Sequence, residues 1–350
     1  MSPSLLAAGL LCVALAFALW LVWLNRVLNR WPNSPAKPYV MGLSLAVALA
    51  AGALWPVVVG SPMSFAVPTL GIALLGVGEI HRISVRARSR VRDLGATVDI
   101  PERLVSTTAL LVRHATVAVP GLGALRVVHL SDLHVGTHLP FEYFRSTIAR
   151  SLEPAPDLIL LTGDFISDSE HLPLLRRLLV GSLHARHGVY AVLGNHDYWS
   201  DPQGVSQVLA EAGIRRVTDE CVTVDLAGER RVTICGTDEP WGPPLARQLP
   251  ATEATIALSH TPDNVYRLAE LGASVVFSGH THGGQFRLPR WGGLVVPSRY
   301  GRRFDRGHFQ VGGTHLFISA GIGIDSIPLR LFCPPDFLVV DFVEPAGTRG

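Results

Sequence analysis

The sequence lacks several features that would define common classes of protein. Neither glycine-rich nucleotide loop, G-x-G-x-x-G or G-x-x-x-x-G-K, occurs, which argues against a kinase or a dinucleotide enzyme. No RNA- or DNA-binding motif is present and the net charge is only +2, so we expect no nucleic-acid partner. The few cysteines have no regular spacing, which excludes a disulfide framework or zinc knuckle, and we expect small buried side chains. They are Cys12, Cys221, Cys235 and Cys333.

Long apolar runs are present instead, and they lie near the start of the chain. Apolar residues make up 48% of the sequence and the mean hydropathy is +0.32, which is high for a soluble protein. Three runs have about the length that a bilayer core requires, at residues 5–24, 39–60 and 63–80. The first is not a cleavable signal peptide, because Arg26 and Arg30 follow it and no basic residue precedes it. We expect a membrane domain over residues 1–81.

The basic residues predict the orientation of this membrane domain. They follow the first and third runs, and none precedes residue 5 or lies within residues 60–62. Three spans therefore place them all on one side, which the positive-inside rule makes the cytoplasm. We expect a multi-pass membrane protein whose N-terminus is outside and whose chain after residue 80 is cytoplasmic. The arginine-rich start of the linker, residues 82–103, either binds anionic headgroups or only anchors the topology.

From residue 104 onward, apolar runs of strand length repeatedly end in aspartate, asparagine or histidine. Amphipathic stretches with helical spacing lie between them, at residues 141–152, 172–183, 203–212 and 262–271. This alternation predicts an α/β fold with a largely parallel, buried sheet. Ligands gather at the carboxyl ends of such strands, so we expect the polar residues there to form one site. They are Asp132, His134, Asp164, Asn195, His196, Asp197, His260, His280 and His282.

The ordered motifs D-x-H, GD, GNHD, a lone H and GHTH resemble the calcineurin-like metallophosphoesterase superfamily. The longer segments SGHTHGGQ, residues 278–285, and GIGIDSIPLRLFCPPD, residues 321–336, are similar to its bacterial branch with membrane-attached members. The resemblance covers residues 104–343 and leaves residues 344–350 as a tail. It implies a four-layer αββα sandwich, in which two mixed sheets stack face to face with helices outside.

The resemblance also implies two divalent metal ions that share one carboxylate. The first ion would be bound by Asp132, His134, Asp164 and His282. The second would be bound by Asp164, Asn195, His260 and His280. Carboxylate, amide and imidazole ligands without thiolate suit Mn²⁺, Fe or Zn²⁺, and we expect Mn²⁺.

Catalytic roles follow from the same resemblance. A metal-bridging hydroxide would attack the phosphorus, and the metals with Asn195 would offset the developing charge. His196 would either stabilise that charge or protonate the leaving group. Asp197 is expected to orient the ligands. Ser167 stands where many relatives have an aspartate that can orient the histidine, and Asp168, one residue later, is the candidate substitute.

A stretch rich in arginine and aromatic residues, residues 286–307, follows the last ligand motif. Arginine matches phosphate geometry and aromatic rings favour membrane interfaces, although a hairpin with a solvated basic face is the alternative. The residues expected to bind substrate are Arg299, Arg302, Arg303 and Arg330.

The sequence therefore predicts a membrane-tethered phosphohydrolase that cleaves a phosphodiester or pyrophosphate bond on a lipid or lipid-linked nucleotide. A soluble cytoplasmic phosphodiester is the alternative substrate. The alternative class is a metal-dependent membrane sensor or scaffold without turnover.

Overall fold

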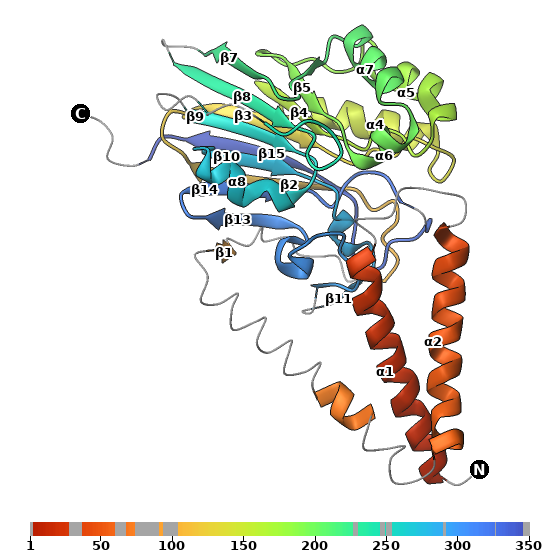
Figure 1. Ribbon diagram of the computed structural model, residues 1–350. Helices are drawn as coiled ribbons and strands as arrows, with labels where there is room; N and C mark the ends of the chain where they lie inside the picture. Colours follow the sequence, from red (N-terminus) through yellow and green to blue (C-terminus); the bar gives the residue numbers. More distant parts are fainter. Residues whose placement is uncertain are drawn as a thin grey trace. The chain divides into compact units, whose positions relative to one another are not determined.

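The structure is a computed structural model. It describes residues 3–27, 37–59, 68–73, 91–93, 104–226, 230–245, 249, 254–289, 292–325 and 327–345. The chain divides into two compact units, Met1–Ser89 and Arg90–Gly350 (Figure 1).

The first unit contains two long apolar helices, α1 (Pro3–Val27) and α2 (Lys37–Val59). Each carries a stretch long and apolar enough to cross a membrane. The helices pack closely, because a Cβ atom on Gly52 would lie 2.8 Å from the carbonyl oxygen of Cys12. Of the expected third span, residues 68–73 are helical and the rest lies outside the described residues.

The second unit contains two large sheets. The six-stranded sheet has the order β2 (Leu111–Ala118), β15 (Asp336–Val343), β3 (Leu125–Leu130), β4 (Leu158–Thr162), β5 (Val189–Val192) and β6 (Arg215–Arg216). The seven-stranded sheet has the order β1 (Val91–Asp93), β13 (Gly307–Val311), β14 (Thr314–Ile318), β10 (Val275–Ser278), β9 (Ala254–Ser259), β8 (Arg231–Thr237) and β7 (Cys221–Asp225). Neighbouring strands are parallel from β3 to β6 and from β14 to β8, and the outer pairs are mixed. A short hairpin joins β11 (Arg287–Leu288) and β12 (Gly292–Gly293).

Three apolar layers show how these sheets are stacked. Val127 of β3 packs between the two sheets, whereas its neighbour Val128 packs against helices, as the alternation of side chains along a strand requires. The second helical layer packs on the outer face of the seven-stranded sheet, with Leu268 against Val276. The result is helix, sheet, sheet, helix, which confirms the predicted αββα sandwich (Figure 1).

The outer helices agree closely with the predicted stretches. They are α4 (Phe141–Leu152), α5 (Leu172–Leu179), α7 (Pro202–Glu211) and α8 (Val265–Glu270), the last preceded by the 3₁₀ turn η3 (Pro262–Asn264). Only α5 ends clearly earlier than predicted. Val180 is extended and Gly181 has a φ of 72°, so the helical geometry stops there despite the apolar pattern.

The cysteines depart from the prediction. Cys333 is a buried free thiol as expected, but Cys221 and Cys235 form a disulfide across the β7–β8 pair. Their spacing carries no recognisable signal, because the pairing results from the register of two antiparallel strands. Sequence spacing alone therefore missed this bond.

A buried histidine in β3 predicts a measurable acid sensitivity. His129 is fully buried, and its Nε2 lies 2.8 Å from Thr162 Oγ1. Burial lowers the pKa of His129 to about 3, whereas the unfolded chain binds this proton below about pH 6.5. The free energy of unfolding should therefore fall between about pH 6.5 and 3, by up to about 1.4 kcal/mol per pH unit from this group.

We expect His129→Gln to show a smaller difference in unfolding free energy between pH 7 and pH 5 than the wild type. Urea unfolding followed by tryptophan fluorescence measures this difference, and His138→Gln, at an exposed histidine, is the matched control. An equal pH dependence in His129→Gln and wild type would contradict the argument.

Candidate metal centre

The predicted ligands lie on sharp turns that follow the strands. Five of them have a positive φ, which residues other than glycine rarely adopt. They are Asp132 (51°), His134 (43°), Asp164 (53°), His280 (66°) and His282 (49°). Such conformations cost about 1–3 kcal/mol each and persist where the surrounding structure imposes them. Here the hydrogen bonds from Asp132 N to Gly163 O (3.0 Å) and from His134 N to Asp164 O (2.9 Å) hold the two turns together.

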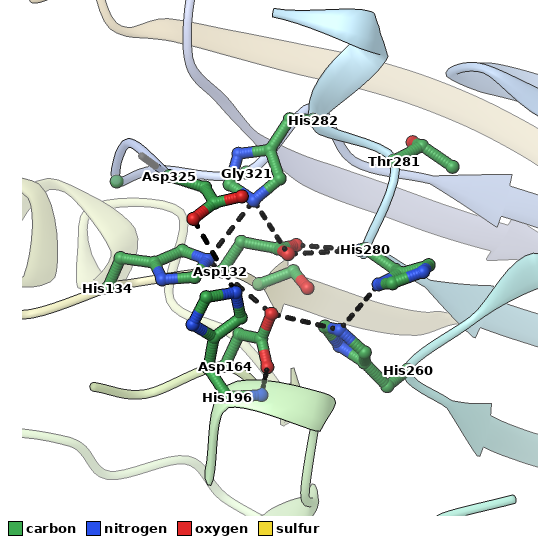
Figure 2. Close-up of polar contacts among 12 residues, drawn as sticks. Asp132, His134, Asp164, His196, His260, His280, Thr281, His282, Gly321 and Asp325 are labelled. Atoms are coloured by element: carbon green, nitrogen blue, oxygen red, sulfur yellow. Dashed lines mark hydrogen bonds and ion pairs between the residues drawn. The ribbon is translucent and has the colours of Figure 1, made fainter. Parts of the chain in front are cut away.

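One group of ligand atoms is formed by Asp132, His134, Asp164 and His282, whose ligand atoms all lie within 4.8 Å of one another (Figure 2). The Nε2 atoms of His134 and His282 face each other at 3.1 Å, and His282 Nε2 lies 3.3 Å from Asp132 Oδ1. All four residues are buried. Nitrogen and oxygen atoms that converge in this way match a site for one cation.

A second group of ligand atoms adjoins the first and contains Asp164, His260 and His280. His260 Nδ1 donates to Thr162 O at 2.5 Å, which directs Nε2 toward Asn195 Oδ1 (3.1 Å) and His280 Nδ1 (3.2 Å). This bond also joins the end of β4 in one sheet to the segment after β9 in the other. Ligands from both sheets therefore meet at one edge.

Asp164 belongs to both groups through a single atom. Its Oδ2 lies 3.4 Å from His134 Nε2 and 3.2 Å from His260 Nε2. Its Oδ1 accepts the backbone N–H of His196 at 2.8 Å, which fixes the rotation of the carboxylate. One oxygen that faces two groups of nitrogen ligands is the geometry of a bridging carboxylate.

Two motif glycines are required by close packing around the carboxylates. A Cβ atom on Gly194 would overlap Asp164 Oδ1, and one on Gly279 would overlap Asp132 Oδ2. The glycine before the ligands therefore leaves space for a carboxylate, in GNHD from the neighbouring strand β4 and in GHTH from β3 of the other sheet.

The electrostatics of the cluster favour cations. Burial lowers the pKa of His280 to about 3 and, with the nearby His134 and Arg330, keeps the pKa of His282 well below its usual value. Both imidazoles are therefore neutral at pH 7. Burial also opposes a charge on His260, but the Asp164 carboxylate raises its pKa to about 9. A bound metal ion would replace that proton.

The residues present fit a pair of divalent ions. The donors are buried carboxylate, amide and imidazole groups, and neutral imidazoles are common metal ligands. The two adjoining groups of ligand atoms, with the family resemblance of the motifs, indicate a centre for two metal ions.

Asp197 lies beneath the centre, where it holds backbone rather than ligand side chains. Its Oδ2 accepts the N–H groups of Asp164 and Gly194, both at 2.9 Å, and its Oδ1 accepts that of Phe165 at 2.8 Å. These bonds fix the turn that carries Asp164. Asp197 thus holds the backbone that carries the Asp164 carboxylate, and its role in orienting the ligands stays a prediction.

Asp168 lies away from the predicted ligands, whereas Ser167 lies beside one of them. Asp168 is exposed and accepts the N–H of Glu170 at 3.3 Å as the N-cap of η2 (Ser169–His171). Ser167 Oγ instead lies 3.4 Å from His134 Nδ1. The structure therefore directs the side chain of Asp168 to the start of η2 and that of Ser167 to a predicted ligand.

The arginines expected to bind substrate occupy different environments. Arg299 is exposed, Arg302 is half-buried in η5 (Gly301–Phe304), and the guanidinium of Arg303 lies over the rings of Tyr266 and Phe304. Their role in substrate binding stays a prediction.

Arg330 departs from the expected role, because it is completely buried. Its Nη2 donates to Ala320 O (2.8 Å) and Gly323 O (2.7 Å) and lies 3.2 Å from His282 Nδ1. We therefore reassign Arg330 from substrate binding to support of His282 and of the loop between β14 and β15.

Sequence reasoning missed one residue at the mouth of the site. Asp325 Oδ1 lies 3.5 Å from Nε2 of His196, whose ring packs edge-on against that of His134 at 4.6 Å (Figure 2). Asp325 belongs to the loop between β14 and β15, which has no strand or helix pattern that would single it out. Only its presence in the motif GIGIDSIPLR connected it with the family.

Comparison with known proteins agrees with this fold and site. Residues 125–284 match the sequence model of the family described as calcineurin-like phosphoesterase. Phosphodiesterase YaeI of Escherichia coli (strain K12) is 30% identical over 244 residues, which is 67% of this chain and 88% of YaeI. The chain therefore belongs to the calcineurin-like phosphoesterase family, and it is a metallophosphoesterase.

Two further relatives extend the comparison. The uncharacterized metallophosphoesterase YkuE of Bacillus subtilis (strain 168) is 29% identical over 249 residues, which is 67% of this chain and 85% of YkuE. UDP-2,3-diacylglucosamine pyrophosphatase LpxG of Chlamydia trachomatis is 27% identical over 218 residues, which is 48% of this chain and 66% of LpxG. The relatives thus include a phosphodiesterase and a pyrophosphatase.

Proposed function

We propose that this protein is a membrane-tethered, metal-dependent phosphohydrolase that cleaves a phosphodiester or pyrophosphate bond on a lipid or lipid-linked nucleotide. The observation that carries the proposal is the shared oxygen of Asp164 between two buried groups of ligands. Bound divalent ions, with Mn²⁺ favoured, would supply Lewis-acid charge and an activated water at this position.

The residues of the chain would bind these ions, compensate charge, donate a proton and bind the substrate. One ion would be held by Asp132, His134 and His282, and the other by Asn195, His260 and His280. Asp164 would contribute to both. Asn195 also offsets charge on the phosphoryl oxygens. The ring N–H of His196 donates a proton to the leaving oxygen, and Arg299, Arg302 and Arg303 bind the anionic substrate.

The nature of the substrate is inferred from two independent observations. The named activities of YaeI and LpxG involve a phosphodiester and a pyrophosphate on a lipid-linked nucleotide. The two apolar helices would hold the enzyme at a lipid surface, which raises its effective concentration for lipid-borne substrates. We propose a membrane domain at residues 1–81, a linker at 82–103, a catalytic domain at 104–343 and a tail at 344–350.

Turnover by the full-length chain in detergent with Mn²⁺ tests this function. We expect kcat/KM for UDP-2,3-diacylglucosamine to be about 10²-fold higher than kcat/KM for UDP-N-acetylglucosamine, which lacks the long acyl chains. Bis(4-nitrophenyl) phosphate and 4-nitrophenyl phosphate report the preference for diester over monoester. Equal rates on the two nucleotides would favour a soluble substrate, and no turnover with Mn²⁺, Fe or Zn²⁺ would favour a sensor.

We propose the cytoplasmic side for the catalytic unit, from the basic residues that follow the apolar runs. The Cys221–Cys235 disulfide favours the opposite side, because disulfides persist in oxidising compartments. Protease added to intact cells should leave the catalytic unit uncut. Cleavage of the unit by the added protease would place it outside.

A further inference from the structure

The structure suggests that the carboxylate which supports His196 comes from a distant part of the chain. Ser167 occupies the position from which many relatives supply an aspartate, and a serine hydroxyl carries no charge. Asp325 provides a carboxylate at ion-pair distance from the His196 ring, at 3.5 Å from Nε2 (Figure 2). Asp325 belongs to neither group of ligand atoms.

Asp325 is held in place by the last residue of the SGHTHGGQ motif. Gln285 Nε2 donates to Asp325 O (3.2 Å) and to Ile327 O (2.7 Å), and Gln285 Oε1 accepts the N–H of Asp325 (3.4 Å). Gln285 is buried and has a φ of 51°. One amide side chain therefore fixes the backbone at and just after Asp325.

Two further contacts fix the same loop against the centre. Gly323 N donates to Asp132 O at 2.7 Å, and the guanidinium of Arg330 binds Gly323 O from the other side. A Cβ atom on Gly321 would lie 2.7 Å from that of Asp132, so the loop lies directly against the first ligand. The backbone that carries Asp325 is therefore built into the metal centre.

The exposure of the pair suits a position beside the leaving group. The His196 side chain is 6% exposed, whereas that of Asp325 is 35% exposed. The imidazole thus lies inside the site, and the carboxylate beside it is partly exposed to solvent.

We propose that Asp325 is the positioning residue of His196, and that it performs the task which an aspartate at position 167 performs in many relatives. Its carboxylate limits rotation of the imidazole and holds the ring beside that of His134. Gln285 and Arg330 contribute indirectly, because they fix the loop. The proposal rests on the proposed role of His196 as proton donor.

The test compares Asp325→Asn, Asp325→Glu, His196→Ala and the double variant His196→Ala/Asp325→Asn in the full-length enzyme with Mn²⁺. Asp225→Asn, at an exposed aspartate on β7, is the matched control. Two diesters differ in the basicity of the leaving group: bis(4-nitrophenyl) phosphate releases a weakly basic phenolate, and diphenyl phosphate releases a more basic one. The less reactive leaving group depends more on the proton from His196.

We expect Asp325→Asn to lower kcat about 10–100-fold on diphenyl phosphate, with a smaller loss on bis(4-nitrophenyl) phosphate and little change in KM. Asp325→Glu should recover part of the loss, and Asp225→Asn should match the wild type. The double variant should be no slower than His196→Ala, because residues that act as a unit are not additive. Metal content and the thermal unfolding midpoint should stay unchanged.

Several results would overturn the proposal. The first is a double variant in which the two losses of kcat multiply. The second is an equal loss of kcat on both diesters in Asp325→Asn. The third is a larger loss on diphenyl phosphate that is seen in Asp168→Asn instead of Asp325→Asn. A gain in monoester hydrolysis with unchanged diester hydrolysis would show that Asp325 acts by repelling dianions, which also overturns it. If His196→Ala keeps full activity, the proposed role of His196 fails as well. If His196→Ala loses activity and Asp325→Asn does not, only the role of Asp325 is rejected.

Discussion

Asp164→Asn should remove both metal ions and reduce phosphodiester hydrolysis by about 10³-fold or more. The expected size follows because a metal ion contributes several kcal/mol to such a reaction and about 1.4 kcal/mol changes the rate tenfold. The physical reason is the shared Oδ2, which lies within 3.4 Å of a histidine nitrogen in each group. An amide in its place has neither the charge nor two equivalent oxygens.

Single-histidine variants make this prediction specific. His282→Ala and His280→Ala each remove a ligand from one group only, so each should lose about one ion per chain. Elemental analysis of purified full-length protein gives the count, and thermal unfolding confirms that the variants are folded. Glu153→Gln, an exposed change from carboxylate to amide, is the control. Retention of one full ion by Asp164→Asn would show that its carboxylate is not shared.

His196→Ala should lower kcat by about 10²–10⁴-fold while metal content stays at the wild-type level. The backbone N–H of His196 donates to Asp164 and is kept in the variant, so the shared carboxylate should retain its orientation. The lost group is the imidazole, which lies inside the site. Its removal should slow protonation of the leaving group without disturbing the ligands.

The matched control for this prediction is His138→Ala, at an exposed histidine shortly after the D-x-H motif. Steady-state kinetics with the diester and elemental analysis should be run on the same preparations. Loss of metal from His196→Ala would mean that this ring is a ligand, and full activity would remove it from the mechanism.

Much of the fold was predictable because its signals are local. Buried strands such as β4 and β5 appear in the sequence as continuous apolar runs, and each ends at a polar motif. The helical period predicted α4 to the residue, since no interior glycine or proline interrupts it. The assignment of strands to two separate sheets came instead from the family resemblance, because periodicity says nothing about which strands pair.

The clustering of the candidate ligands was also predictable, since every one of them follows a strand. The remaining parts of the site depend on contacts between distant segments. Asp325 lies in a loop without periodicity, and the burial of Arg330 depends on carbonyl groups of that same loop. By residue type alone, an arginine near the end of a motif is predicted to bind phosphate. Only the folded backbone shows that Arg330 donates to carbonyl groups instead.

The bond from His260 to Thr162 ties the two β-sheets together at the edge where the ions would bind. An ion that binds only the folded chain stabilises it by mass action, so chelation should lower the melting temperature. Amide hydrogen exchange should then accelerate in strands of both sheets as well as in the ligand turns. The supply of metal in the cell would thereby govern how long the enzyme survives, in addition to how fast it works.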